Sequence, residues 1–202
     1  MDLNNQNLEW KLCEAYFSIL KMSTISEVSI DQLSTLSKIS INEVKKIVPN
    51  NPMNYRFFFL KILISKLDRE VLYELKEDIA DDTISSTHDK ILEGLSLRFE
   101  KYLEYKLPFK VLSKNPKERI EIFLKVFTEN YNFSSNLLTL IKEDQKCGIK
   151  ILKSLALNIV FVKSLEVFLK DENKDLDSVI RYLDKYLSDI EDLGFFLGII
   201  KK

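Results

Sequence analysis

Apolar residues recur at three- and four-residue steps along almost the whole chain. The first such segment covers roughly residues 7–22 and includes Leu8, Leu12, Tyr16 and Ile19. This spacing places the apolar side chains on one face of a helix. No segment shows a strand signal or an internal repeat. The pattern therefore predicts an all-α protein of about nine helices.

Residues 29–48, SIDQLSTLSKISINEVKKIV, predict two short helices joined by a tight turn. Ser29 suits the cap of the first helix because its hydroxyl can accept a backbone N–H that has no partner within the helix. Ser40, with Glu43 three residues later, forms a capping-box pattern at the start of the second helix. Pro49 ends that helix, since proline lacks an N–H. Two capped helices with a short connection predict a helix-turn-helix.

The apolar positions of this segment predict a small shared core. The side chains expected to face inward are Ile30, Leu33, Leu36, Ile39, Ile41, Val44, Ile47 and Val48. Three amphipathic helices can bury such a core together. We therefore predict a helix-turn-helix domain over residues 1–52 and a second helical domain over residues 53–202.

The second domain shows further helical segments separated by short polar stretches. Helices are expected over 53–79, over 87–106 with Thr87 as its cap, from Pro108, from Asn115-Pro116 to 131, over 148–170 and over 175–197. Residues 132–135 are candidates for a break before 137–141. The short polar turn at 171–174 predicts that the last two helices are antiparallel neighbours.

Composition and charge limit the classes of protein that this chain can represent. The 202 residues are 46% hydrophobic and 30% charged, with a net charge of -1. There is no global basic field, so any nucleic-acid binding must come from a local patch. The longest uncharged apolar stretch, 154–162, is far shorter than the roughly 18 residues that a membrane-spanning helix needs. With Cys13 and Cys147 expected as free thiols, we predict a cytoplasmic protein.

Enzyme chemistry finds little support in the sequence. His88 is the only histidine, and the cysteines have no ligand-like spacing to it. We expect His88 to be exposed in the first turn of its helix. The four glycines are scattered, so no phosphate-binding loop is present. The sequence therefore predicts no catalytic site, no metal site and no cofactor.

The second helix of a helix-turn-helix enters the major groove of DNA. The candidate contacts are Lys38 in the turn, Ser40, Asn42, Lys45 and Lys46 on the outer side of the second helix, and Arg56 beyond it. Asn can read adenine, and Lys can contact guanine or phosphate. Three Lys against Asp31 and Glu43 leave one net positive charge across 29–48. A helical subdomain with a solvated Lys face is the alternative.

The segment SIDQLSTLSKISINEVKKIV, between a first helix and a long fourth helix, resembles the N-terminal domain of TetR-type transcriptional regulators. The resemblance places Lys38 where the family usually has Gly, which implies a left-handed turn. HDKILEGLSLRFEKYLEYK at 88–106 and LNIVFVKSLEVFLKDENKDLDSVIRYLDKYL at 157–187 are similar to a TetR-like bacterial group. That group is related to ubiquinone-biosynthesis accessory proteins, which share the fold, bind isoprenoid lipid and have lost DNA recognition.

The resemblance implies a homodimer formed by the last two helices. The apolar residues suited to that interface are Leu155, Val162, Leu165, Leu169, Leu183, Leu187 and Ile190. Packing of this stripe entirely within the monomer is the alternative. The C-terminal segment 194–202, GFFLGIIKK, is expected to pack on the bundle, with contact to a membrane surface as the alternative.

The resemblance also implies a ligand cavity among the middle helices. Its candidate lining is Phe58, Phe99, Tyr102, Phe123, Phe127, Tyr131 and Phe161, which predicts an apolar small-molecule or lipid ligand. Plain core packing is the alternative for these rings. Two functions follow as expectations. The first is a TetR-like regulator that binds operator DNA and responds to an apolar molecule. The second is a lipid-binding accessory protein of ubiquinone metabolism with a vestigial helix-turn-helix.

Overall fold

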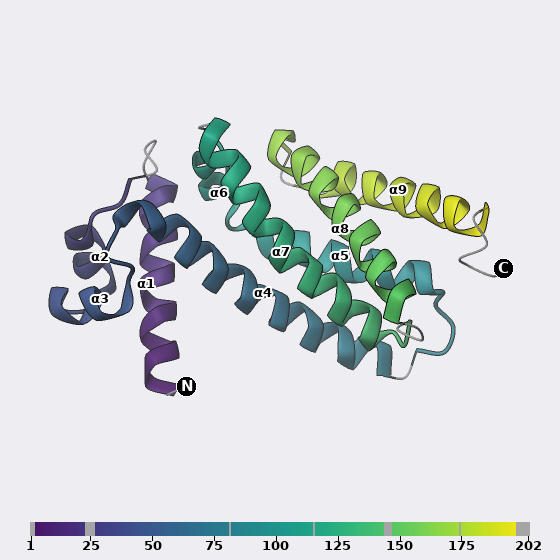
Figure 1. Ribbon diagram of the computed structural model, residues 1–202, viewed down its shortest axis with the longest axis horizontal. Coiled ribbons are helices and arrows are strands. Elements are labelled where there is room, and N and C mark those ends of the chain that lie inside the picture. Colours follow the sequence, from purple (N-terminus) through teal and green to yellow (C-terminus); the bar gives the residue numbers. More distant parts are fainter. Residues whose placement is uncertain are drawn as a thin grey trace. The chain divides into compact units, whose positions relative to one another are not determined.

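The computed structural model describes residues 3–22, 27–80, 82–114, 116–143, 147–173 and 175–196. These residues form nine α-helices and one 3-10 turn, which confirms the predicted all-α fold (Figure 1). The helices are α1 (Leu3–Met22), α2 (Ile30–Ser37), α3 (Ile41–Ile47), α4 (Tyr55–Ala80), α5 (Thr87–Leu103), α6 (Lys106–Leu112), α7 (Pro116–Leu140), α8 (Cys147–Lys170) and α9 (Asp177–Phe196). The 3-10 turn, Pro52–Asn54, precedes α4.

The chain divides into two compact units. One unit, here called the head, comprises Met1–Lys66 and Tyr105–Lys125, and the other, here called the trunk, comprises Leu67–Glu104 and Val126–Lys202. This division differs from the boundary predicted at residue 52, because the first half of α4 and all of α6 belong to the head. Helices α4 and α7 therefore each contribute residues to both units.

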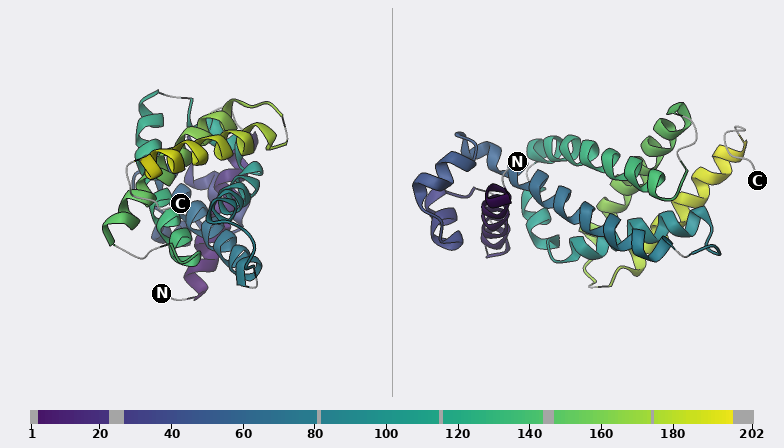
Figure 2. Two further views of the ribbon diagram at one scale, coloured as in Figure 1. Left: turned by 90° about the vertical axis from the view of Figure 1, so that its right-hand side faces the viewer. Right: turned by 90° about the horizontal axis from the view of Figure 1, so that it is seen from below.

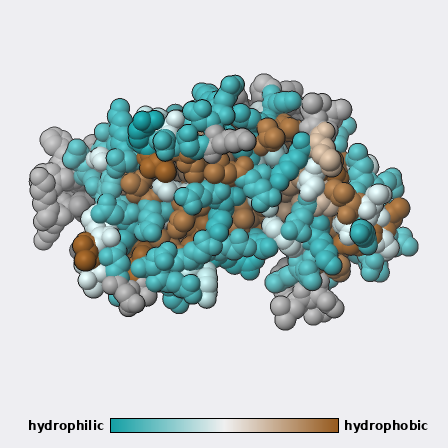
Figure 3. Space-filling model, turned by 180° about the vertical axis from the view of Figure 1, so that it is seen from behind, coloured by the Kyte–Doolittle hydropathy of each residue, from teal (hydrophilic) through white to brown (hydrophobic). Residues whose placement is uncertain are grey.

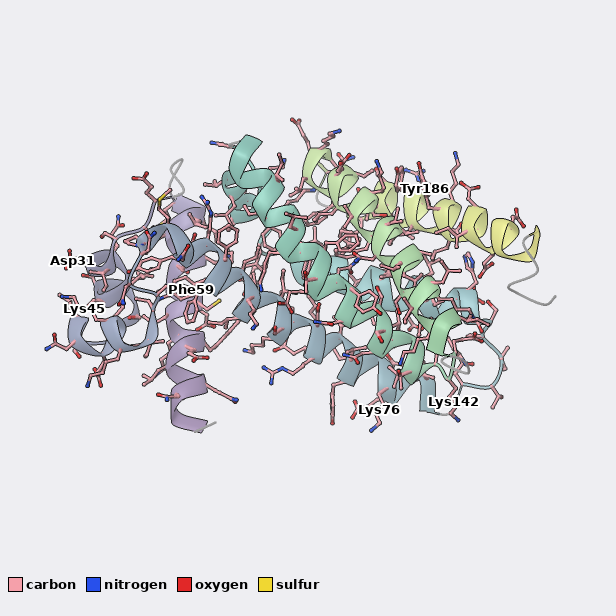
Figure 4. The ribbon with its side chains drawn as sticks, in the orientation of Figure 1. Asp31, Lys45, Phe59, Lys76, Lys142 and Tyr186 are labelled. Atoms are coloured by element: carbon pink, nitrogen blue, oxygen red, sulfur yellow. The ribbon has the colours of Figure 1, made fainter. Side chains whose placement is uncertain are left out.

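Aromatic side chains of α1 form the centre of the head. The ring of Tyr16 stacks on Phe59 of α4, with centroids 4.7 Å apart, and Phe17 meets Tyr105 edge to face at 5.5 Å. The thiol of Cys13 donates to the carbonyl oxygen of Phe59 at 3.4 Å. Burial of Cys13 raises the pKa of its thiol. Phe59 lies between α4 and α1 (Figure 4). This packing explains why α4 begins within the head.

The trunk is a bundle in which α9 packs against both α8 and α5 (Figures 1 and 2). Gly94 of α5 permits a close approach to its neighbours. A Cβ atom at this position would lie 2.9 Å from a methyl carbon of Leu137 on α7 and 3.0 Å from one of Leu75 on α4. The absent side chain therefore sets the spacing of three helices.

The break expected at residues 132–135 is absent, because α7 continues unbroken to Leu140. Phe133, Ser134, Leu137 and Leu138 are all buried on its inner side. Tertiary packing thus outweighs the weak helix propensity of Asn and Ser in this stretch.

The cap of α5 was predicted one residue too late. Ser86 is the N-cap, since its hydroxyl accepts from the backbone N–H of Asp89 at 3.1 Å and its own N–H donates to the Asp89 carboxylate at 3.1 Å. Thr87 is the first helical residue, and its hydroxyl donates to Glu143 at 3.1 Å. Neighbouring hydroxyl residues offer the same capping chemistry, and Asp89 at the third helical position selects Ser86.

Hydrophilic side chains cover much of the face drawn in Figure 3, with apolar groups visible between them. Within the described ranges, no helix combines the length and the apolar character needed to cross a membrane. The C-terminal segment from residue 197 lies outside the described residues, so the expectations about its packing stay predictions.

Candidate functional site

Helices α2 and α3 form the predicted helix-turn-helix, and both N-termini are capped. The Ser29 hydroxyl accepts from the N–H of Gln32 at 3.2 Å, and the Gln32 side chain accepts from the N–H of Ser29 at 2.9 Å. At α3, the Ser40 hydroxyl accepts from the N–H of Glu43 at 3.3 Å and donates to its carboxylate at 2.6 Å. Each such cap stabilises its short helix by about 1 kcal/mol.

The turn between α2 and α3 contains a left-handed residue. Lys38 has φ 58° and ψ 31°, the left-handed conformation that the family resemblance implies at this position, and it costs roughly 1 kcal/mol for a residue with a side chain. The Ser34 hydroxyl donates to the carbonyl oxygen of Ile39 at 2.7 Å and holds the turn against α2. Leu33, Ile39 and Val44 are buried beneath it. The inner side of the motif is therefore apolar and its geometry is fixed.

The outer side of α3 is polar. Ser40, Asn42, Lys45 and Lys46 are exposed, as is Lys38 in the turn. Figure 4 shows Lys45 extending outward from α3. These five predicted contact residues thus lie on one short segment.

Glu43 is the acidic residue of this segment. Hydrogen bonds from Ser40 lower the pKa of its carboxyl group, so it stays negatively charged at neutral pH. The negative charge is thereby held at the start of α3.

Arg56, the sixth predicted contact, lies at the second position of α4 and is half-buried. The carbon at the centre of its guanidinium group lies 4.8 Å from the centre of the Phe57 ring. This distance is within the range of a cation–π contact.

Two apolar residues expected in the core of the motif are exposed instead. Leu36 is 44% exposed, and Ile41 is 40% exposed. Leu36 lines an open groove of about 550 Å³ between α1 and the turn, with Leu8, Ala15 and Ile39 among the other lining residues. Ile41 is the first residue of α3, so no preceding helical turn covers it. Periodicity alone did not reveal these end effects.

An ion pair lies at the centre of the trunk. Arg98 of α5 is fully buried, and its Nε and Nη2 donate to the two carboxylate oxygens of Asp68 on α4 at 2.7 and 2.9 Å. The guanidinium carbon lies 4.1 Å from the ring centre of Phe161 and 4.4 Å from that of Phe133. Burial raises the pKa of the Asp68 carboxyl group, and the charge of Arg98 opposes that shift.

Hydrogen bonds extend this centre to α7 and α8. Arg98 donates to Asn130, the Asn130 amide donates to Asn158, and the Asn158 amide donates to the carbonyl oxygen of Phe127 at 2.8 Å. One helical turn away along each helix, the hydroxyls of Ser134 and Ser154 are buried without a hydrogen-bond partner. The sequence interpretation missed this network, although the spacing of Arg98 from Leu95 and Tyr102 places it on the inner face of α5.

The predicted ligand-pocket residues are divided between the two units. Phe99, Tyr102 and Phe161 form one cluster in the trunk, in which Phe99 and Phe161 stack with centroids 4.8 Å apart. Phe127 and Tyr131 are half-buried in the trunk portion of α7. Phe58 belongs to the head, and the side chain of Phe123 lies outside the described residues.

The predicted interface residues of α8 and α9 differ in exposure. Val162, Leu183 and Leu187 are buried within one chain, Leu165, Leu169 and Ile190 are half-buried, and Leu155 is 37% exposed. The exposed apolar surface of α8 consists of Ile151, Leu152, Leu155 and Ile159, here called the α8 stripe. Much of the predicted interface therefore already packs inside the trunk.

His88 is less exposed than predicted and joins α5 to α9. Its side chain is 18% exposed, with Nε2 at 2.9 Å from Asp184 and Nδ1 at 3.1 Å from Glu191. Partial burial by itself lowers the pKa of His88, but the hydrogen bond to Asp184 and the charge of Glu191 raise it above 6.5 overall. Across the described side chains, no three His, Cys, Asp or Glu residues gather as metal ligands would.

Comparisons with models of known protein families, with curated proteins and with solved structures find no match to this chain. The capped helix-turn-helix is therefore the feature from which a function can be argued.

Proposed function

We propose that this protein is a TetR-like transcriptional regulator that binds operator DNA as a homodimer through α3. The observation that carries the proposal is the capped α2–turn–α3 motif with Asn42, Lys45 and Lys46 on its exposed side. A helix that buries one side and presents amide and ammonium groups on the other suits the major groove.

Each exposed group of the motif has a matching partner on DNA. The Asn42 amide can bond two edge atoms of adenine, and Lys45 can reach guanine N7 or O6. Lys46, Lys38 and Ser40 suit phosphate oxygens, which fix the position of the protein on the duplex without reading sequence. Specificity in this proposal therefore depends on the residues of the first turns of α3.

The modest charge of the motif predicts moderate salt dependence. If Lys38 and Lys46 of each head neutralise one phosphate each, a dimer loses affinity with a slope of about −4 in log K against log salt. Binding is then easiest to detect at low ionic strength.

The α8 stripe supports the dimeric part of the proposal. Its four residues are between 37% and 55% exposed and lie at three- and four-residue spacing on one side of α8. Such a continuous apolar strip suits helix-to-helix contact with a second copy of the chain. To bind two half-sites, such a dimer must hold its two recognition helices about 34 Å apart, one turn of DNA.

The effector in this proposal is an apolar small molecule bound in the trunk. The aromatic cluster of Phe99, Tyr102 and Phe161 supports an apolar rather than a strongly polar ligand. These rings pack on one another, so binding requires them to move apart. The ligand would then act by favouring one trunk conformation over another.

The decisive experiment is an electrophoretic shift with the fragment upstream of the protein's own gene, in 50 mM salt. The wild-type protein should bind the fragment and slow its migration. The double variant Lys45→Glu, Lys46→Glu should lose at least a hundredfold in affinity for it. The matched control is Lys76→Glu, Lys142→Glu, which makes the same charge change at two exposed residues far from α3 in sequence (Figure 4). The control should bind as the wild type does.

Failure of the wild-type protein to retain any fragment at low salt would reject this function. Mass spectrometry of the denatured protein then tests the lipid-binding alternative, which requires a co-purified isoprenoid or fatty molecule. An empty extract would reject that alternative as well.

A further inference from the structure

Ile41 is an apolar residue in an otherwise polar setting. It is 40% exposed at the first position of α3, directly between Ser40 and Asn42, which are both exposed. Lys45, one turn further along, is exposed too. A residue at i+4 lies next to residue i on a helix surface, so Ile41 borders the face that carries Asn42 and Lys45.

The core beneath α3 is closed by other residues. Val44 is fully buried and Val48 is 6% exposed, and Ile39 fills the turn below them. The exposed part of the Ile41 side chain therefore adds nothing to the packing of the head. Its neighbours along the segment, Ser40, Asn42 and Lys45, are polar and exposed, so α3 itself does not extend it into an apolar patch of the size that a protein partner uses.

The first turn of the second helix is the part of a helix-turn-helix that meets base edges. In the major groove, one base edge offers an apolar group of its own, the C5-methyl of thymine. An exposed isoleucine in this position has the shape and polarity to pack on that methyl group. The amide of Asn42, the next residue, suits adenine.

We propose that Ile41 is a specificity-determining residue that selects a thymine by packing on its C5-methyl group. This inference rests on the DNA-binding function proposed above and names the sequence class that α3 reads. The Cα atoms of neighbouring residues are about 3.8 Å apart, close to the spacing of about 3.4 Å between base pairs. The selected thymine therefore lies in the same base pair as the adenine read by Asn42 or in an adjacent one, and each half-site contains an A·T-rich step.

The test removes only the methyl group. A duplex of 30 base pairs is selected with the wild-type protein from a random-sequence pool, and its thymines are replaced one at a time by deoxyuridine. One thymine in each half-site should be sensitive, with a loss of about fourfold per half-site, as expected for exposing one buried methyl group. Replacing both together should cost more than tenfold.

The variant Ile41→Ala should bind the thymine and deoxyuridine duplexes equally, with the affinity that the wild type shows for deoxyuridine. Leu107→Ala is the matched control, because Leu107 is also an exposed apolar residue of the head. It should keep the wild-type preference for thymine. Since the deoxyuridine series uses the wild-type protein, the result does not depend on the folding of any variant.

Equal binding of the thymine and deoxyuridine duplexes by the wild type overturns the role of Ile41 and leaves the proposed DNA-binding function standing. Recovery of no duplex from the random pool overturns both.

Discussion

The head and the trunk hold their helices by different means. In the head, aromatic rings of α1 and α4 make an apolar centre, and hydrogen-bonded caps define the short helices α2 and α3. In the trunk, one buried cation ties α5 to α4 by an ion pair and to α7 by a hydrogen bond. Caps act on individual helix ends, whereas the buried cation sets the register between helices.

This difference has an energetic consequence for each unit. The caps of α2 and α3 contribute about 1 kcal/mol each, and these contributions are local and close to additive. The trunk contains a charge whose removal from water costs several kcal/mol and which is tolerated only while its partners are in place. We therefore expect small, graded responses to mutation at the caps of the head and abrupt ones at the buried ion pair of the trunk.

The largest expected effect comes from Asp68→Ala, which leaves Arg98 buried without its carboxylate. The trunk should lose about 3 to 5 kcal/mol of unfolding free energy. Circular dichroism in urea reports all helices, whereas the fluorescence of Trp10, the only tryptophan, reports the head. The dichroism midpoint should fall by more than the Trp10 midpoint.

The double variant Asp68→Leu, Arg98→Met is the control for this result. It replaces the ion pair by apolar side chains, so its midpoint should stay close to that of the wild type. If Asp68→Ala instead shifts both signals equally, head and trunk unfold as one cooperative unit and the contrast between them fails.

A smaller effect is expected from relieving the left-handed turn. Lys38→Gly should stabilise the head by roughly 1 kcal/mol, because glycine adopts φ 58° without steric cost. The Trp10 midpoint should therefore rise. Lys142, with φ 62°, is the matched left-handed lysine of the trunk. Lys142→Gly should raise the dichroism midpoint and leave the Trp10 midpoint unchanged, and the opposite assignment would contradict the division into units.

The smallest effect concerns pH. The pKa of His88 is raised in the folded state, so its contribution is fully present below pH 6.5 and is lost as the pH rises through the higher folded value. Because its partners Asp184 and Glu191 are largely exposed, the change should stay below about 1 kcal/mol. Urea titrations at pH 5.5 and 8.5 should show this loss, and His88→Gln should abolish it. A loss of equal size in the variant would assign the pH effect to other groups.

Local signals allowed much of the head to be predicted from the sequence. The caps at Ser29 and Ser40 depend on residues within a few positions of one another, so a linear pattern contains them. The left-handed conformation of Lys38 was implied only by the family resemblance. The apolar spacing predicted that Ile41 faces inward, and the exposure of its side chain was missed. Such spacing predicts burial correctly only where a helical turn lies on both sides of the residue, and the first residue of a helix has no preceding turn.

The centre of the trunk required information that a linear pattern does not contain. Charged residues are mostly exposed, so Arg98 was not considered as a core residue. Its place on the inner face of α5 was readable from its spacing, but its partners Asp68 and Asn130 come from two other helices, and Asn158, which accepts from Asn130, comes from a third. The dimer interface predicted on α8 and α9 could not be derived from the pattern for the same reason. Leu183 and Leu187, two of its residues, are buried within their own chain.

The rate at which the buried thiol of Cys13 is alkylated can report how often the head opens. Burial raises the pKa of this thiol and so keeps it protonated, and the thiol donates to the carbonyl oxygen of Phe59. An alkylating reagent therefore reaches it only while α1 and α4 are separated. The rate at which the peptide containing Cys13 acquires the reagent therefore measures spontaneous opening of the head in plain buffer. In the proposed DNA complex, a bound duplex that holds the helix-turn-helix closed would lower this alkylation rate.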